Sequence, residues 1–401
     1  MNRARPARAI AASAAPTSLK RRRAPASDSS SAAPHPTVPS AYGRCPDVAA
    51  YEKLDRIGQG TYGTVYRARH RPTGSIVALK RIILHHEESD GYPPTSLREA
   101  HVLRGAASGH PNIVRLLDVA VGGTRSGVFL VFEYAEHDLA GLVDRHHSAH
   151  GRSPFRESEA KRLALQLMGA VAHLHVRRVL HRDLKLSNLL YNHRGELKVA
   201  DFGLARSVPS GRRRRRQQGG VSTVGEFGSP KALTPKVVSL WYRPPELMLG
   251  GEEYGAAVDN WGIGCIVSEL LSGTPLIRGK NEPDQISKMF ALLGPPSLEL
   301  WPSLSDMPLV KSGAVEIPAR HSGGDSGAAF LDVHRDLSVG GLSLLGGLLT
   351  YDPDRRTTAA GGLRSEWFTE APLPASPGLM PTFPTRHGTA RSKGARKGGS
   401  G

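Results

Sequence analysis

One octapeptide, His181–Asn188, combines side chains that can accept a proton and balance phosphate charge. It reads HRDLKLSN, with an aspartate followed by a lysine two residues later and an asparagine five residues later. We predict that Asp183 accepts the proton of a substrate hydroxyl, that Lys185 meets a terminal phosphate and that Asn188 binds a divalent metal ion. The chemistry that these three residues could share is phosphoryl transfer to an alcohol.

A glycine-rich run, Gly58–Val65, offers a backbone suited to binding phosphate groups. Its sequence is GQGTYGTV, and glycines let main-chain N–H groups turn toward phosphates at close range. Such triplets also occur in ordinary turns and in dinucleotide-binding folds, where the motif opens a helix. Here the run continues into strand-like residues and then into VALK, which ends at Lys80. That order favours a phosphate-binding loop between two strands.

Three charged residues outside the octapeptide complete a set for handling phosphate and metal charge. Lys80 is expected to hold the inner phosphates of a nucleotide, although a lysine at a strand end can also be a plain surface residue. Glu99 is expected to orient Lys80 through an ion pair between a helix and a strand. Asp201 opens the sequence DFG after the strand-like LKVA, so we predict that it binds a metal ion. A chain that keeps these residues together with Asp183 and Asn188 is predicted to be an active catalyst.

The elements around these motifs change character along the chain. Over 51–135, apolar and polar residues alternate in short runs punctuated by glycine and proline, which is typical of antiparallel strands. After Pro154, which suits the first turn of a helix, apolar residues recur every three or four positions, as one face of a helix requires. We therefore predict an α+β fold of two lobes with a cleft between them, a small β-rich lobe over 51–135 and a larger helical lobe over 136–368.

Taken together, residues 51–368 resemble a eukaryotic protein kinase, and the lysine at position 185 is typical of the serine/threonine type. The sequence YPPTSLRE, ending at Glu99, is similar to the PITSLRE and PISSLRE sequences that name two cyclin-dependent members. TPKVVSLWYR, from Thr234 to Arg243, resembles the end of their activation segment, and Met380–Pro384 resembles the PISSLRE-type C-terminus. The PISSLRE type is the first choice and the PITSLRE type the second, while WYRPPE leaves the transcriptional elongation kinases open.

The resemblance implies that the chain uses ATP and Mg²⁺ to phosphorylate serine or threonine in transcription or cell-cycle control. The expected catalytic residues are Asp183, Lys185, Asn188 and Lys80, and the expected metal ligands are Asn188 and Asp201. Phe132 stands at the gatekeeper position, and Glu133 and Ala135 would offer backbone groups to adenine, although all three would also suit ordinary strand and linker packing. The expected ATP-binding residues are Ile57, Gly58, Gln59, Gly60, Thr61, Tyr62, Gly63, Thr64, Val65, Ala78, Lys80, Phe132, Glu133, Ala135 and Asp138.

Other matching residues are expected to support the site without doing chemistry. Glu246, in a PPE sequence that stands where the family has APE, is expected to form a buried ion pair with Arg356. Asp259, Trp261 and Gly264 form the pattern DxWxxG, which resembles the start of the family's helix that braces the octapeptide. Neither group is assigned a catalytic role.

The resemblance also implies regulation by a cyclin subunit and by phosphorylation. A cyclin would contact the Ser96–Arg98 surface and bring the helix that carries Glu99 inward, unless that helix already lies in place. Thr234 matches the activating phosphothreonine of the family. The arginines expected to receive its phosphate are Arg98, Arg182 and Arg206. Thr61 and Tyr62 match inhibitory sites beside the phosphates, or are unmodified loop residues.

Substrate choice is expected to favour a serine or threonine followed by proline. The turn at Val237–Val238 would leave no acceptor for the backbone N–H of the residue after the target, and proline has no such N–H. A mitogen-activated type of kinase, which needs no cyclin, would share this preference. Those kinases typically carry a TxY pair, whereas the matching residues here are Leu233, Thr234 and Pro235. A scaffold with a kinase fold and weak catalysis is the other alternative.

Most of the net positive charge lies in three segments that read as flexible. The formal net charge is +17, and the segments are residues 1–40, Arg212–Arg216 and 386–401. We therefore expect no direct nucleic-acid partner, despite the basic composition. The sequence contains no apolar run long enough to span a bilayer, so no membrane partner is expected either. The two cysteines, Cys45 and Cys265, are far apart and favour a reducing compartment.

The kinase-like region is flanked and interrupted by segments of a different composition, of which the N-terminal tail and the insert are predicted to be disordered. They are a basic N-terminal tail over 1–50, an activation-segment insert over 207–233 and a basic C-terminal tail over 369–401. The N-terminal tail contains KRRR at 20–23, and this basic patch together with the family resemblance predicts a nuclear protein, with the cytoplasm as a second location. An organellar transit peptide or a plain tail is the alternative. The insert is expected to be inert, to act in nuclear import or to bind an acidic partner.

Overall fold

The computed structural model describes residues 45–60, 63–82, 93–122, 127–208, 238–319 and 327–385. All of these residues belong to the unit of the chain that begins at Cys45. The predictions made for Thr61, Tyr62 and Thr234, for the insert beyond Val208 and for the outer parts of both tails lie outside the described residues.

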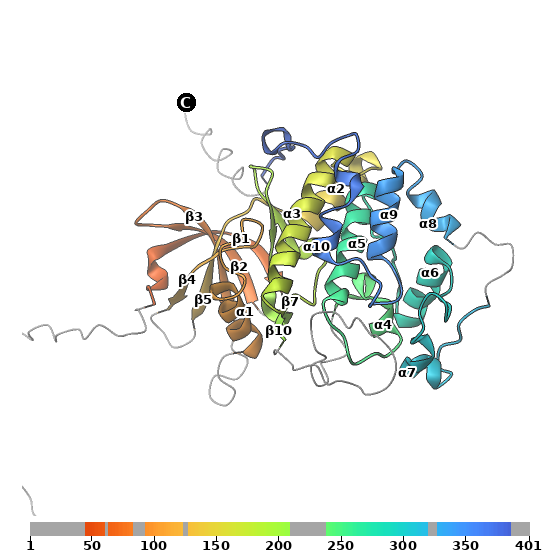
Figure 1. The fold of residues 1–401 in the computed structure, drawn as a ribbon. Coiled ribbons are helices and arrows are strands. Elements are labelled where there is room, and N and C mark those ends of the chain that lie inside the picture. Colours follow the sequence, from red (N-terminus) through yellow and green to blue (C-terminus); the bar gives the residue numbers. More distant parts are fainter. Residues whose placement is uncertain are drawn as a thin grey trace, which may run out of the picture. The chain divides into compact units, whose positions relative to one another are not determined.

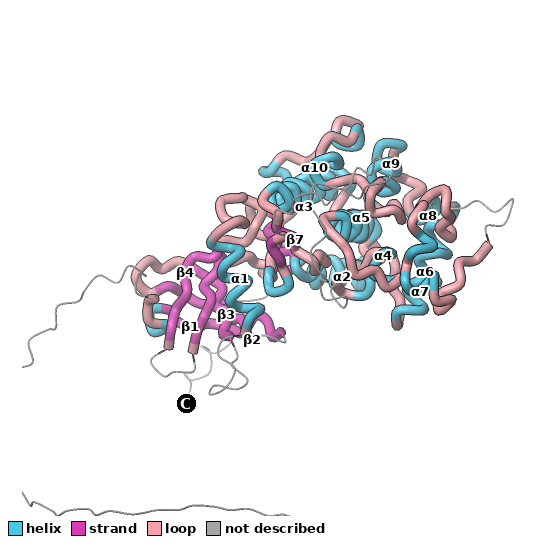
Figure 2. The backbone as a smooth tube through the Cα atoms, turned by 60° about the horizontal axis from the view of Figure 1, so that its bottom comes forward, coloured by secondary structure: helices cyan, strands magenta, loops and turns pink. Residues whose placement is uncertain are grey.

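Among the described residues, five antiparallel strands form the sheet of the smaller lobe, in the spatial order β1-β2-β3-β5-β4 (Figures 1 and 2). The strands are β1 (Tyr51–Gly60), β2 (Gly63–His70), β3 (Ile76–Ile82), β4 (Leu116–Val121) and β5 (Val128–Glu133). The helix α1 (Pro94–Arg104) packs beside the sheet near β4. The alternating sequence of these strands fits the sheet, because successive side chains of a strand point to opposite faces.

The alternation in β3 decides which of its residues reach the cleft. Val77 and Leu79 are buried on the outer face of the sheet, where they pack in one cluster with Phe129. Ala78 and Lys80 lie on the opposite face and line a cavity between the sheet and the helical lobe. The period of two residues along the strand therefore delivers the lysine to the side where charged groups of the helical lobe can meet it.

The larger lobe is built around two adjacent helices, α3 (Glu157–Val176) and α5 (Ala257–Ser272) (Figure 1). α5 is buried along almost its whole length. Gly264 lets a neighbouring helix approach α5 closely, because a Cβ at this position would lie 2.9 Å from Leu349 Cδ2. The remaining α-helices are α2 (Leu139–His150), α4 (Pro245–Met248), α6 (Glu282–Leu293), α7 (Pro308–Lys311), α8 (Ala328–Val333), α9 (Val339–Leu348) and α10 (Ala359–Gly362).

Short strands position the two motif loops at the edge of the helical lobe. β6 (His137–Asp138), β8 (Leu189–Tyr191) and β9 (Leu197–Val199) form one small sheet, and β7 (Val179–Leu180) pairs with β10 (Arg206–Ser207). The octapeptide runs from β7 to β8, and the DFG sequence runs from β9 to β10. Strand pairing therefore brings the two motifs side by side. The 3-10 helices are Val48–Ala50, Leu186–Asn188, Phe202–Leu204, Leu240–Tyr242, Leu304–Asp306, Glu366–Phe368 and Pro377–Leu379.

The predicted fold class, an α+β fold with a β-rich smaller lobe and a larger helical lobe, is confirmed. One detail of the prediction is wrong, because Pro154 precedes α3 and does not lie in its first turn. The helix begins at Glu157, where the carboxylate of Glu159 accepts a hydrogen bond of 2.7 Å from the backbone N–H of Arg156. The helix capped by this side chain therefore begins three residues after the proline.

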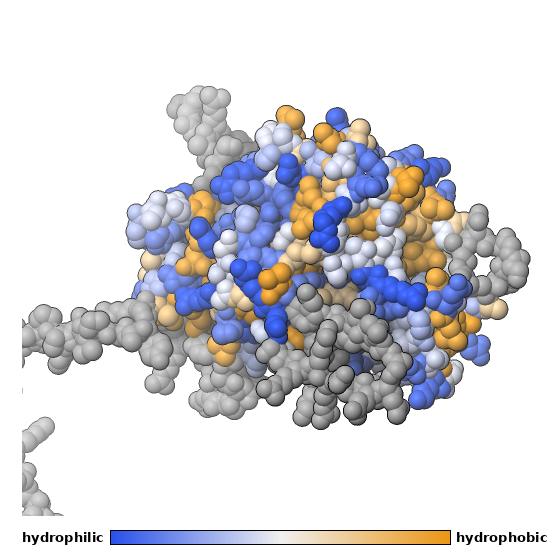
Figure 3. All heavy atoms as spheres, in the orientation of Figure 1, coloured by the Kyte–Doolittle hydropathy of each residue, from blue (hydrophilic) through white to orange (hydrophobic). Residues whose placement is uncertain are grey.

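The surface of the described part mixes residues of both kinds. On the face shown in Figure 3, hydrophobic residues lie scattered among hydrophilic ones. Large hydrophobic side chains with high exposure include Leu97 in α1 and Val339 at the start of α9. Within the described ranges, no helix combines the length and the apolar character needed to cross a membrane.

A buried ion pair joins α4 to the chain beyond α9. Arg356 Nη1 and Nη2 donate to Glu246 Oε1 and Oε2, each at 2.8 Å, and both residues are almost fully buried. Arg356 also donates to the carbonyl oxygens of Thr350, Tyr351 and Ala257, so its guanidinium is well satisfied. The pair that the sequence predicts is therefore confirmed, and it ties α4 to the start of α5.

Replacing Arg356 by methionine is expected to lower the free energy of unfolding by about 3–5 kcal/mol, because Glu246 then keeps a buried charge without its partner. Arg355→Met is the matched control, since the side chain of Arg355 is 57% exposed and pairs with Asp352 at 3.5 Å. Loss of such an exposed pair is expected to change stability by less than about 1 kcal/mol. Denaturant titration followed by tryptophan fluorescence measures both changes, and similar losses in the two variants would contradict the role of the buried pair.

Candidate active site

A cavity of about 520 Å³ lies between the sheet and the helical lobe. The residues predicted from the sequence that line it are Ile57, Gly58, Gly63, Val65, Ala78, Lys80, Glu99, Phe132, Glu133, Ala135, Asp138, Asp183, Lys185, Asn188 and Asp201. Gln59 pairs with Thr64, and Gly60 with Gly63, in the hairpin of β1 and β2 that borders the cavity. Gln59 and Thr64 are not among the described residues that line it. Motif residues far apart in the sequence therefore face one common space.

Lys80 lies between two carboxylates. Its Nζ is 2.7 Å from Glu99 Oε2, 3.1 Å from Glu99 Oε1 and 3.7 Å from Asp201 Oδ1. Burial by itself would lower the pKa of Lys80, but the two carboxylates outweigh this effect and raise that pKa. The lysine therefore stays charged in the cleft, and the ion pair between β3 and α1 that the sequence predicts is present.

Asp183 is held in one orientation by its neighbours. Lys185 Nζ and Asn188 Nδ2 donate to Asp183 Oδ2 at 2.8 Å and 2.9 Å. Ser239 Oγ donates to Asp183 Oδ1 at 3.1 Å and accepts a hydrogen bond from Lys185 Nζ, also at 3.1 Å. An oriented carboxylate beside a lysine can align a hydroxyl group and accept its proton.

A buried carboxylate of α5 holds the octapeptide from behind. Asp259 Oδ1 accepts a hydrogen bond from the backbone N–H of Arg182 at 2.8 Å, and Oδ2 accepts from the N–H of His181 and from His175 Nε2, both at 2.9 Å. Burial would raise the pKa of Asp259, but these donors, His175 first, hold it below its ordinary value. Arg182 has a φ of 65°, a left-handed conformation that strains a residue with a side chain. The bonds to Asp259 offset that strain.

Three arginines gather beside the DFG sequence. Arg98 Nη1 donates to Gly203 O at 3.0 Å, and Arg182 Nε donates to Leu204 O at 2.8 Å. Burial and the positive charges of Arg182 and Arg206 lower the pKa of Arg98. Cations that disfavour one another's charge in this way would be stabilised by an anion bound among them.

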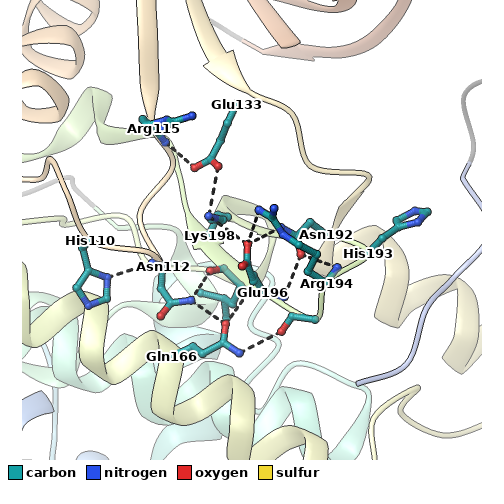
Figure 4. Close-up of polar contacts among 12 residues, drawn as sticks. His110, Asn112, Arg115, Glu133, Gln166, Asn192, His193, Arg194, Glu196 and Lys198 are labelled. Carbon is teal, nitrogen blue, oxygen red and sulfur yellow. Dashed lines mark hydrogen bonds and ion pairs between the residues drawn. The ribbon is translucent and has the colours of Figure 1, made fainter. Parts of the chain in front are cut away.

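The carboxylate of Glu133 is bound by residues that do not line the cavity (Figure 4). Its Oε1 accepts a hydrogen bond from the backbone N–H of Arg115 at 2.8 Å, and its Oε2 lies 3.3 Å from Lys198 Nζ. Lys198 is buried and also lies 3.4 Å from Glu196 Oε2. This network ties the end of β5 to β9, and because the carboxylate is bound there, we expect the main chain of Glu133 to face the cavity.

The two sides of α1 differ sharply in exposure. Ser96 and Glu99 are both 3% exposed, whereas Leu97 is 58% exposed. The expectation that the Ser96–Arg98 surface faces a partner is therefore wrong for Ser96. Residues three positions apart share one side of a helix, so Ser96 turns inward together with Glu99.

The carbonyl group of Val238 is engaged by Arg243. Val238 has a φ of 69°, which is rare for a β-branched residue, and its oxygen accepts hydrogen bonds from Arg243 Nε at 3.3 Å and Nη2 at 3.1 Å. Arg243 Nη1 donates to Glu282 Oε1 at 2.6 Å, which fixes the guanidinium. The unusual backbone conformation thus directs this carbonyl toward an internal donor.

The donor set of the cavity suits a nucleotide with a hard divalent metal ion. Asn188 and Asp201 both line it, and amide and carboxylate oxygens are ligands that Mg²⁺ accepts. In the ranges that the structure covers, no group of three or more His, Cys, Asp or Glu side chains could hold a metal. Mg²⁺ in nucleotide sites takes its other ligands from phosphates and water, so a pair of protein ligands fits. Ala78 and Leu190 add apolar surface, which suits a base.

Several residues of the site were not predicted from the sequence. The additional lining residues are Val114, Tyr134, Glu136, His137, Arg145, Ser187, Leu190, Ala200, Gly203 and Leu204. Half of them carry no reactive group, although Leu190 lies two positions after Asn188, where a strand returns to the same face. Ser239 was also missed, and its position in TPKVVSLWYR was the available signal, because that sequence begins at the predicted phosphothreonine, Thr234.

Comparisons with known proteins agree with this geometry. Residues 51–368 match the family model described as protein kinase domain. The chain is 45% identical over 341 residues to cyclin-dependent kinase G-2 of Oryza sativa subsp. indica, a match that covers 85% of this chain and 44% of the relative. It is 45% identical over 339 residues to the probable cyclin-dependent kinase 10 of Dictyostelium discoideum, with 84% of each chain covered.

The human relative shows the same pattern. Cyclin-dependent kinase 11B of Homo sapiens is 44% identical over 351 residues, which cover 87% of this chain and 40% of that protein. The chain thus spans less than half of the length of the rice and human relatives. The family match and the identity to these relatives establish that the chain belongs to the protein kinase family, in its PITSLRE-like cyclin-dependent branch.

Proposed function

We propose that the chain is a cyclin-dependent serine/threonine kinase that transfers the γ-phosphoryl group of ATP to serine or threonine residues followed by proline, in transcription or cell-cycle control. The observation that carries this proposal is the shared cavity of Lys80, Asp183 and Asp201. Phosphoryl transfer depends on positioning and on charge neutralisation, and these residues supply both in one space. The names of the relatives, which are cyclin-dependent kinases, support the same assignment.

Each residue has a distinct role in the proposed reaction. Asp183 orients the substrate hydroxyl and accepts its proton. Lys80 binds the inner phosphates, and Lys185, whose Nζ lies 2.8 Å from Asp183 Oδ2, balances the charge of the γ-phosphate. Asn188 and Asp201 would hold Mg²⁺, which neutralises phosphate charge when it is bound.

Asp183→Asn is expected to reduce phosphate transfer from ATP to a Ser-Pro peptide by about 10²–10⁴-fold, because an amide cannot accept the proton of the hydroxyl. The full-length chain is purified from its own cells with the subunits that accompany it, and incorporation of labelled phosphate is measured. The affinity for ATP should stay within about twofold, since Asp183 is assigned to the chemical step and not to nucleotide binding. Equal rates for the variant and the wild type would contradict the catalytic role and indicate that the chain is a scaffold with a kinase fold.

The preference for proline follows from the state of the Val238 carbonyl. The residue after the target serine or threonine brings a backbone N–H that needs an acceptor. Because the Val238 oxygen is already bound by Arg243, it is a poor acceptor for that N–H. Proline lacks the N–H, so it can occupy the position without leaving a buried donor unsatisfied.

Arg243→Ala is expected to raise kcat/KM for a Ser-Ala peptide relative to a Ser-Pro peptide by about tenfold, because it releases the Val238 oxygen as an acceptor. The matched control is Glu282→Gln, which removes the ion pair at Arg243 Nη1 and leaves the bonds to Val238 in place. This control should keep the original preference. An unchanged ratio of the two kcat/KM values in Arg243→Ala would show that the preference for proline does not depend on this carbonyl.

A cyclin subunit and a phosphate on Thr234 are proposed to regulate the activity. The exposed Leu97 on α1 supports a protein partner on that helix. Since the pair between Lys80 and Glu99 is already formed here, the partner would stabilise this position of α1 and would not need to create it. The cluster of Arg98, Arg182 and Arg206, described above, supports an anion that joins α1 to the catalytic loop. A phosphate on Thr234 would supply that anion.

Arg206→Gln is expected to reduce the rate increase produced by Thr234 phosphorylation by about three- to tenfold, because one cation of the phosphate site is lost. Arg206 is exposed and lies on the short strand β10, so the substitution leaves the buried contacts of Arg98 and Arg182 intact. Rates are compared before and after phosphorylation by an activating kinase. Arg69→Gln, an exposed arginine on β2, should leave the increase unchanged. The same rate increase in both variants would show that Arg206 is not part of the phosphate site.

A further inference from the structure

The chain beyond the matched kinase region returns to the helical lobe and stays in contact with it. Residues 369–385 follow the last matched residue, Phe368. The dark blue end of the described chain in Figure 1 passes back to α3, where the N–H of Ala375 donates to Ser158 O at 2.8 Å. The fully buried Lys161 of α3 donates from Nζ to Glu370 O at 3.0 Å. This segment is therefore anchored before it reaches residues 380–383, here named the C-terminal strap.

The residues of the C-terminal strap differ in exposure. Met380 is buried and Phe383 is partly buried, whereas Thr382 is exposed. Met380 lies against the turn between β8 and β9, where a Cβ on Gly195 would come within 2.3 Å of Met380 Cβ. Only a glycine leaves room for this contact, and the turn also requires its positive φ of 74°.

Phe383 completes an aromatic cluster at the small sheet of β6, β8 and β9. Its ring contacts Phe155, Tyr191 and His137 with centroid distances of 5.9, 6.0 and 6.0 Å. The contacts with Phe155 and His137 are edge-to-face, at 82° and 85°, which is a favourable arrangement for aromatic rings. Phe155 and Tyr191 are buried, so Phe383 is the residue that the strap contributes to a packed cluster.

Two hydrogen bonds fix the strap to the same strands. Tyr191 OH donates to Pro381 O at 2.7 Å, and His137 Nε2 donates to Phe383 O at 3.2 Å. A carbonyl oxygen can only accept, so His137 carries its proton on Nε2 in this contact. Burial lowers the pKa of His137 and so favours the neutral ring, although the hydrogen bond to Phe383 O opposes this shift.

The strands that the strap holds also line the nucleotide cavity. His137 of β6 pairs with Tyr191 of β8, and the next pair is Asp138 with Leu190. His137, Asp138 and Leu190 all line the cavity. Through His137 and Tyr191, the strap thus contacts one residue that lines the cavity and one that adjoins a lining residue along the strand. A shift of β6 or β8 would displace the connection between the lobes, where adenine is expected to bind.

We infer that the C-terminal strap is a positioning element of the ATP site, which holds β6 and β8 in the geometry that binds the nucleotide. The inference rests on the proposed function, since it concerns the same cavity. Phe383 and Pro381 touch neither the cavity nor the reacting groups, so their effect acts through His137 and Tyr191. Loss of the strap contacts should therefore weaken ATP binding and leave the chemical step almost unchanged.

The test compares Phe383→Ala and Tyr191→Phe with the wild-type chain, each at full length with its accompanying subunits. Phe383→Ala is expected to raise both the KM for ATP and the dissociation constant of a fluorescent ATP analogue by about five- to tenfold, with kcat within about twofold. Tyr191→Phe removes only the hydroxyl that binds Pro381, so it should raise both constants by a smaller factor. Thr382→Ala, on the exposed side of the strap, is the matched control and should change neither.

Nucleotide binding separates this inference from the proposed function. A wild-type chain that binds the ATP analogue but transfers no phosphate would overturn the kinase proposal, while the dissociation constants would still decide the role of the strap. Unchanged constants in Phe383→Ala would overturn the inference, and so would a loss of kcat without a change in KM. Thermal unfolding is measured for each variant. If Phe383→Ala fails to fold, Tyr191→Phe, which keeps the ring cluster, decides the outcome against Thr382→Ala.

Discussion

The hydrogen bonds from the backbone of His181 and Arg182 to Asp259 anchor the catalytic loop to α5, a helix that is buried along almost its whole length. A carboxylate in such a place is unfavourable unless its oxygens are matched by donors, and His175 completes the match. The left-handed backbone of Arg182 persists because these bonds hold it. The position of Asp183, the next residue, therefore depends on the packing of α5. A substitution in the core around α5 can shift Asp183 without contacting the site.

The two halves of the cleft are held by different kinds of contact. The helical half depends on backbone groups bound to a buried side chain, and it also contains the enclosed pair of Glu246 and Arg356. The sheet half reaches the site through the ion pair of Lys80 and Glu99, which joins two separate elements. A side-chain pair between elements can break when one of them moves. The sheet half is therefore the part of the site that a movement of α1 would change, and it carries the exposed side of α1.

The sequence predicts well which charged residues share the cavity, for physical reasons. Asp183 and Asn188 share one loop, and the alternation of β3 sends Lys80 to the cleft, so local spacing places all three. Contacts between distant segments are harder to predict: Ser239 meets Asp183 only after folding. The fold class followed from periodicity. The prediction for Ser96 is wrong because Ser96 lies on the same side of α1 as the buried Glu99. The prediction for Pro154 is wrong because α3 begins at Glu157, where the side chain of Glu159 binds the N–H of Arg156.

Glu133 has a consequence for small molecules that compete for the cleft. Its carboxylate is held by Arg115 and Lys198, away from the cavity, so a compound that occupies the adenine region meets main chain at this position. Main-chain donors and acceptors are the same whatever the residue type. An inhibitor therefore cannot distinguish kinases by the side chain at this position. Its selectivity must come from other residues that line the cavity, or from how strongly the bonds of Glu133 to Arg115 and Lys198 resist a change in the angle between the lobes.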